Sequence, residues 1–115
     1  MKPLGNRLEK FFSEMGISPD EARDISITAV EDFVASALDQ KKSTVILRYF
    51  GINREKGESS RAIGLEFGIN EKGVVSLRKS ALRTLKCPAQ RERLFALMRR
   101  EEESKKILSL LLGIS

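Results

Sequence analysis

The sequence has no histidine, no tryptophan and a single cysteine, Cys87, and these absences exclude several kinds of site. One cysteine cannot form a disulfide within the chain. Without histidine, neither a zinc site of mixed histidine and cysteine ligands nor a histidine-dependent catalytic triad can be built. We therefore expect no metal, no cofactor and a reduced, cytoplasmic protein.

Long hydrophobic runs are also missing. The longest uninterrupted run, residues 94–98, is far too short to span a bilayer, and the segment after Met1 is too polar for a signal peptide. Residues 51–58 contain two glycines but lack the Gly-Lys-Ser/Thr arrangement of a phosphate-binding loop. Because no acid–base or nucleophilic site is recognisable either, we expect neither a membrane protein nor an enzyme.

What the chain does contain favours helices. Of its 115 residues, 41% are hydrophobic, a share that suits a folded core, and aromatic residues are limited to six Phe and one Tyr. Leu, Ala, Glu, Lys and Arg are abundant, and the alternation typical of strands is hard to find. The length fits one small domain, so the composition predicts an all-α fold built as a small helical bundle.

Positive charge is concentrated in one part of the chain. Residues 1–40 carry four basic and eight acidic side chains, whereas residues 71–100 carry nine and two. Residues 41–70 have a net charge of +3, and the last fifteen residues have −1. A basic segment on a helical domain is the pattern expected of a phosphate-binding surface. An ordinary solvated helix face is the alternative.

Local signals place helices in the first 40 residues. Apolar residues recur at helical spacing over residues 4–15, and Gly16 ends the run. This segment is either an amphipathic helix or a linker that becomes helical when docked. Ser18 and Glu21 form a capping box with Pro19 at the first helical position. From there we predict one long helix to about Asp39.

The remaining helices follow from caps and breakers. Gly51 ends a helix that starts near Lys41, and residues 51–58 form a polar loop. Ser59 or Ser60 caps a helix that runs to Phe67, and Asn70 caps the next one. The predicted helices are 41–50, 60–67, 71 to about 86, and 89–112.

The stretch IGLEFGINEKGVVSL, residues 63–77, has the spacing of a helix-turn-helix. Two short helices that cross steeply need a small residue where their backbones approach and one that tolerates positive φ at the turn; Gly64 and Gly68 meet these needs. The side chains expected to form the wedge between the helices are apolar: Ile63, Phe67, Ile69, Val74 and Leu77. We predict a helical bundle containing a helix-turn-helix, with extra N- and C-terminal amphipathic helices. An ordinary helical hairpin is the alternative.

If the second helix lies in a major groove, this apolar stripe determines which residues face the DNA. Lysines donate to guanine, Glu71 accepts from the cytosine amino group, and Val75 meets a thymine methyl. Arg61, Arg78 and Lys86 are better placed for phosphates. The predicted DNA-binding residues are Arg61, Asn70, Glu71, Lys72, Val75, Ser76, Arg78, Lys79, Arg83 and Lys86.

From Ser18 to Met98 the chain resembles the end of region 3 and region 4 of bacterial RNA polymerase sigma factors of the housekeeping type. The resemblance is carried by SPDEA at 18–22, VILRYFGI at 45–52, IGLEFGIN at 63–70, ALRTLKCP at 81–88 and QRERL at 90–94. It implies a domain at residues 41–98, preceded by an N-terminal helical segment, 1–40, and followed by a C-terminal helical extension, 99–115. The chain is shorter than such factors, so it is a stand-alone regulator or a fragment of a longer one.

The resemblance implies duplex DNA and the flap of the polymerase β subunit as partners. The flap would contact the helices that bear Phe33 to Ile52, unless those residues simply fill the core. The family's base-contacting arginines are replaced here by Glu71, Gly73 and Val75, and its glutamine by Ser76. A different DNA sequence, a weakly specific phosphate grip and no DNA binding all stay open.

Two functions compete on this basis. The first is a DNA-binding transcription factor module that grips duplex DNA through the helix at about 71–86. The second is a protein-interaction or dimerisation module that uses the same fold without promoter reading. LEKFF at 8–12 and ILSLLLGI at 107–114 are apolar beyond what region 4 alone needs. These ends either pack on each other or pair between chains in a homodimer.

Overall fold

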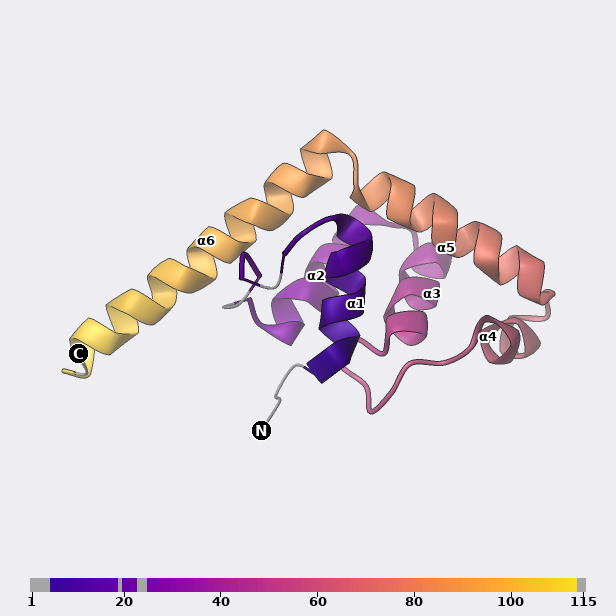
Figure 1. Ribbon diagram of the computed structural model, residues 1–115, viewed down its shortest axis with the longest axis horizontal. Coiled ribbons are helices and arrows are strands. Elements are labelled where there is room, and N and C mark those ends of the chain that lie inside the picture. Colours follow the sequence, from indigo (N-terminus) through magenta and orange to yellow (C-terminus); the bar gives the residue numbers. More distant parts are fainter. Residues whose placement is uncertain (1–4, 19, 23–24, 114–115) are drawn as a thin grey trace.

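The computed structural model describes residues 5–18, 20–22 and 25–113. Within these residues the chain forms six α-helices and no strand, which confirms the predicted all-α fold (Figure 1). The helices are α1 (Gly5–Met15), α2 (Ile27–Ala37), α3 (Gln40–Phe50), α4 (Ser60–Phe67), α5 (Glu71–Leu85) and α6 (Pro88–Leu111).

Caps account for the boundaries of the three central helices, and all of those described here except Asp39 were predicted from the sequence. At the start of α3 the side chain of Asp39 accepts a hydrogen bond from the backbone N–H of Lys42 at 2.8 Å, and Gly51 ends the helix in the left-handed conformation. Ser59 caps α4 and Asn70 caps α5 in the same way. The sequence therefore located these helices to within about one residue.

The long helix predicted from residue 19 is wrong. The Ser18–Glu21 capping box does form, with Ser18 Oγ 3.0 Å from Glu21 Oε1, but it stabilises a turn. Pro19 lies outside the described residues. Helix α2 begins only at Ile27, where the Ser26 hydroxyl caps the N–H of Ala29. Tertiary packing overrides the local signal, because the turn allows both Ala22 and Ile25 to be buried.

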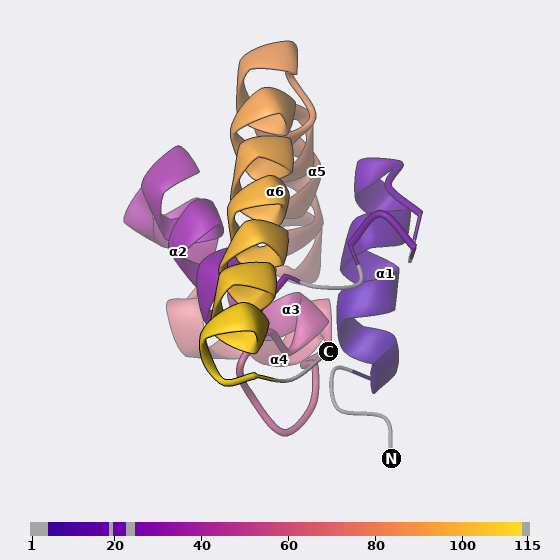
Figure 2. The same cartoon turned by 90° about the vertical axis from the view of Figure 1, so that its left-hand side faces the viewer.

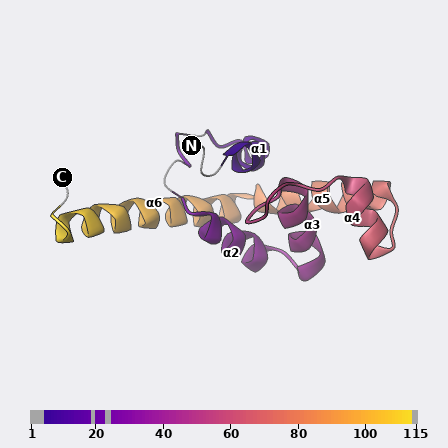
Figure 3. The same cartoon turned by 90° about the horizontal axis from the view of Figure 1, so that it is seen from below.

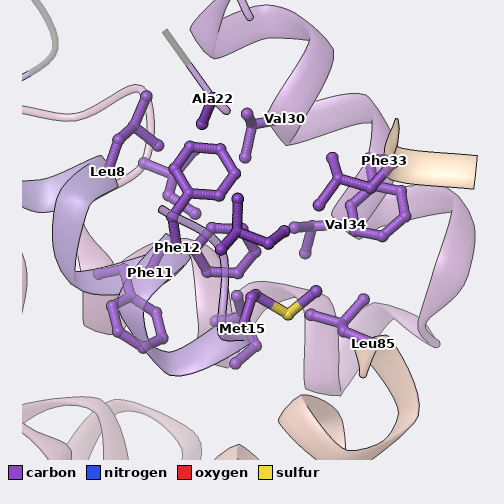
Figure 4. Close-up of a cluster of buried hydrophobic side chains, with 14 of the residues drawn as sticks. Leu8, Phe11, Phe12, Met15, Ala22, Val30, Phe33, Val34 and Leu85 are labelled. Atoms are coloured by element: carbon purple, nitrogen blue, oxygen red, sulfur yellow. The ribbon is translucent and has the colours of Figure 1, made fainter. Parts of the chain in front are cut away.

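Helix α1 forms as predicted and belongs to the main hydrophobic core (Figure 4). Leu8, Phe11, Phe12 and Met15 are buried, and the ring of Phe11 meets that of Phe50 edge-on with centroids 5.6 Å apart. The same core includes buried residues of α2, α3, α5 and α6. The predicted domain boundary at residue 40 therefore does not divide the core.

Helices α1 and α2 lie on opposite sides of the line formed by α5 and α6 (Figures 2 and 3). Helix α1 contacts both α3 and α5, and α2 contacts α3, α5 and α6. This arrangement leaves one face of α5 open along the molecule.

Helix α6 starts in the core and then leaves it. Leu94 and Met98 are buried, but beyond Glu101 the helix runs away from the rest of the molecule (Figures 1 and 3). Near its end, Ile107, Leu108, Leu110, Leu111 and Leu112 are exposed. The two apolar ends of the chain thus do not pack on each other, because α1 is in the core and these residues face solvent.

Candidate nucleic-acid interface

Helices α4 and α5 are joined by the three-residue turn 68–70. Gly68 has a φ of 72°, and a Cβ at Gly64 would lie only 2.6 Å from the carbonyl oxygen of Ile69. A side chain at either position would be strained or would clash with backbone. Both glycines therefore do what their positions in the sequence predicted.

The apolar wedge between these helices is a second, smaller hydrophobic cluster. Ile63 of α4, Val74 of α5 and Val45 of α3 are fully buried in it. Phe67, Ile69 and Leu77 pack against them, so every residue predicted for the wedge is present. In Figures 1 and 2, α4 crosses α5 steeply. Helix α3 packs against both α4 and α5.

The open face of α5 presents most of the predicted DNA-binding residues. Lys72, Lys79 and Arg83 are exposed, and within the described part of the chain they form no hydrogen bond or ion pair. Val75 is half-buried and lies in a shallow depression of the surface. The depression is lined by Glu71, Lys72, Val75, Ser76 and Lys79. Arg61, in the first turn of α4, and Lys86, at the end of α5, are exposed as well.

Two of the predicted site residues, Arg78 and Asn70, form contacts that stabilise the fold. The guanidinium of Arg78 lies over the ring of Tyr49, with Cζ 4.1 Å from the ring centroid, and donates a hydrogen bond to Ser60 Oγ at 3.3 Å. It thereby ties α5 to α3 and α4, a role that the sequence did not reveal. The Asn70 side chain caps α5 by accepting from the N–H of Gly73 at 2.8 Å.

The glycine in the first turn of α5 is explained by this cap. A Cβ at Gly73 would lie 3.2 Å from Asn70 Oδ1 and 3.5 Å from a side-chain carbon of Ile69. The absence of a side chain at Gly73 therefore leaves room for the side chains of Asn70 and Ile69 in the turn.

An ion cluster that the sequence did not predict holds α4 against α3. Arg48 of α3 donates two hydrogen bonds to Glu58, at 2.6 and 2.8 Å, and also pairs with Glu66 of α4. These hydrogen bonds lower the pKa of both carboxyl groups below the usual value. Glu58 and Glu66 lie 10 and 18 positions after Arg48, so no local sequence pattern reveals the cluster.

Within the described residues there is neither a candidate metal site nor a helix that could cross a membrane. They contain no group of three or more histidine, cysteine or acidic side chains able to hold a metal ion. Among the helices described, none combines the length and apolar character needed to cross a membrane. Comparisons with protein-family models, curated proteins and solved structures find no match to this chain.

Proposed function

We propose that this chain is a DNA-binding transcription factor module in which α4 and α5 act as a helix-turn-helix and α5 enters the major groove of duplex DNA. In this proposal the N-terminal half of α5 meets base edges while the surrounding cations contact phosphates. The resemblance to sigma factor region 4 is the model for this function, and a cytoplasmic location goes with it.

One observation carries the proposal. Lys72, Lys79 and Arg83 stand along the open face of α5 without an intramolecular partner among the described residues, beside the depression that holds Glu71, Val75 and Ser76. An ordinary solvated helix face would not require α5 to be held at a defined angle to α4. Here Gly64 and Gly68, the wedge cluster and the Arg78–Tyr49 contact hold α5 in place against α3 and α4.

The test is a salt titration with purified protein and short duplexes of random sequence. Binding should weaken steeply with salt, and Arg61→Ala or Lys86→Ala, each the loss of one predicted phosphate contact, should lower the slope of log K against log salt by about 0.9. Lys56→Ala, a change at an exposed loop lysine far from α5 in sequence, is the matched control and should leave the slope unchanged. Absence of salt-sensitive binding to any duplex would overturn the proposal.

Selection from random duplexes then addresses specificity. A bidentate contact contributes about 1–3 kcal/mol of discrimination against the wrong base. Glu71, Val75 and Ser76 would each make only a single contact to a base edge. We expect enrichment of a short motif that differs from the usual −35 element. If no motif is enriched while salt-sensitive binding persists, the surface grips phosphates only.

A second candidate function is protein docking without promoter reading. The exposed apolar end of α6, residues 107–112, favours it, because contiguous apolar surface of this kind marks interaction sites. The partner would be the β flap of RNA polymerase, another transcription factor or a second copy of the chain. Retention of the polymerase flap by the immobilised chain would support the first of these partners, and a dimer that Leu108→Glu dissociates would support the last.

A further inference from the structure

Helix α1 brings an acidic side chain to the basic end of α5. Glu14 lines a second depression together with Lys79, Leu82, Arg83, Lys86 and Cys87. Lys79 and Arg83 lie in the C-terminal half of α5 and Lys86 is its C-cap, and the three cations follow one another at spacings of four and three residues. Glu14 is the one acidic group in this lining.

The position of Glu14 is determined by the core. Phe11 and Met15 on either side of it are fully buried, and α1 contacts both α3 and α5. Glu14 itself is exposed on the neighbouring face of α1. The backbone of Glu14 is therefore held beside this end of α5 for as long as α1 stays in the core.

We infer that Glu14 limits how tightly α5 holds the phosphates of a duplex. A phosphate that approaches Lys79, Arg83 and Lys86 meets the negative charge of Glu14 at the edge of the same depression. The carboxylate attracts the cations in the free protein and repels the incoming phosphate, and both effects weaken DNA binding. The inference rests on the proposed function and adds a residue from outside the helix-turn-helix.

The two depressions also divide the face of α5. They share Lys79, but the other side chains predicted to contact bases line only the N-terminal one: Glu71, Lys72, Val75 and Ser76. Glu14 borders the other one. It should therefore change affinity and salt dependence and leave the preferred DNA sequence unaltered.

The test compares Glu14→Gln with Glu9→Gln in the full chain. Glu9 is also exposed on α1, so both variants change the net charge equally, but Glu9 does not line the depression. With a random-sequence duplex at low salt, Glu14→Gln should tighten binding by about two- to fivefold, the scale of one exposed charge interaction. Glu9→Gln should change it less, and the difference should shrink as salt is added.

Charge reversal gives a second readout. Glu14→Lys should steepen the slope of log K against log salt by about 0.9, as one added phosphate contact would, while the motif from duplex selection stays the same. Equal effects of the Glu14 and Glu9 variants, or a shift in melting temperature without a change in affinity, would overturn the inference alone. Failure of every variant to bind DNA would overturn the proposed function with it.

Discussion

Arg78 and Lys72 belong to the same helix and carry the same charge, yet their surroundings give them different roles. Arg78 is stacked on Tyr49 and bonded to Ser60, so its guanidinium stabilises the crossing of the helices. Lys72 faces solvent and has no such partner in the described structure. At the residue scale, the side of the helix on which a residue lies decides whether its charge is used inside the fold or exposed to solvent.

Gly64 offers the sharpest test at this scale. Its missing Cβ is needed because a methyl group would lie 2.6 Å from a backbone oxygen that cannot move independently of the turn. Gly64→Ala should lower the free energy of unfolding by about 1–3 kcal/mol despite the better helix propensity of alanine. Urea unfolding followed by circular dichroism measures this.

Gly73→Ala is the comparison for that experiment. Its added methyl group would meet the Asn70 side chain at 3.2 Å, with no backbone atom among its nearest contacts. The destabilisation should therefore be smaller than that of Gly64→Ala. Equal stability of the Gly64 variant and the unmodified chain would mean that α4 and α5 are not held at this close approach.

At the element scale, the position of α4 depends on both apolar and ionic contacts. Helix α4 has only eight residues, too few for a stable helix by itself. The wedge cluster buries Ile63, and Arg48 reaches from α3 to Glu66 on α4 and to Glu58 on the loop before it. The first contact was predicted from periodicity, whereas the second joins residues too far apart in sequence to show a pattern.

The Arg48 cluster makes a prediction about acid stability. Glu58 and Glu66 have a folded-state pKa below the ordinary 4.5, so their stabilising effect is fully present above about pH 4.5. It is lost as the pH falls through the lowered values. The melting temperature should therefore drop on acidification, and the drop should be smaller in Glu58→Gln/Glu66→Gln.

Glu103→Gln is the control for that experiment, since Glu103 is exposed on the far part of α6 and is not one of the carboxylates that pair with Arg48. It should retain the full acid sensitivity. If the double variant and the unmodified chain lose the same melting temperature between pH 7 and pH 3, the cluster does not stabilise the fold through ionisation.

At the scale of the whole molecule, the chain combines a packed body with a long projecting helix. The principal extents of 54 × 32 × 22 Å reflect the part of α6 that leaves the core (Figure 1). The open face of α5 and the apolar end of α6 belong to different parts of the molecule. The proposed DNA binding and the proposed protein docking should therefore be separable by substitution.

Substitutions on the projecting part of α6 test whether association between chains can be changed without changing DNA binding. Leu108→Glu/Leu111→Glu should leave the melting temperature and the DNA affinity nearly unchanged, because both side chains are exposed. If α6 mediates association between chains, light scattering should show a dimer that these changes dissociate. Leu65→Glu is the control, since Leu65 is 78% exposed on α4 and should not affect association. A strict monomer at all concentrations would exclude the homodimer.

The sequence by itself determined the all-α class, the glycines and caps of α3, α4 and α5, and the apolar wedge. These depend on neighbours a few residues away, and hydrogen-bonded caps and helical periodicity act over that range. Only the tertiary structure decided that the chain turns after the capping box at Ser18, that α1 belongs to the core, that Arg78 stacks on Tyr49, and that Glu14 lines a depression with three cations. These outcomes depend on packing between segments far apart in the chain, and local patterns do not specify which segments meet.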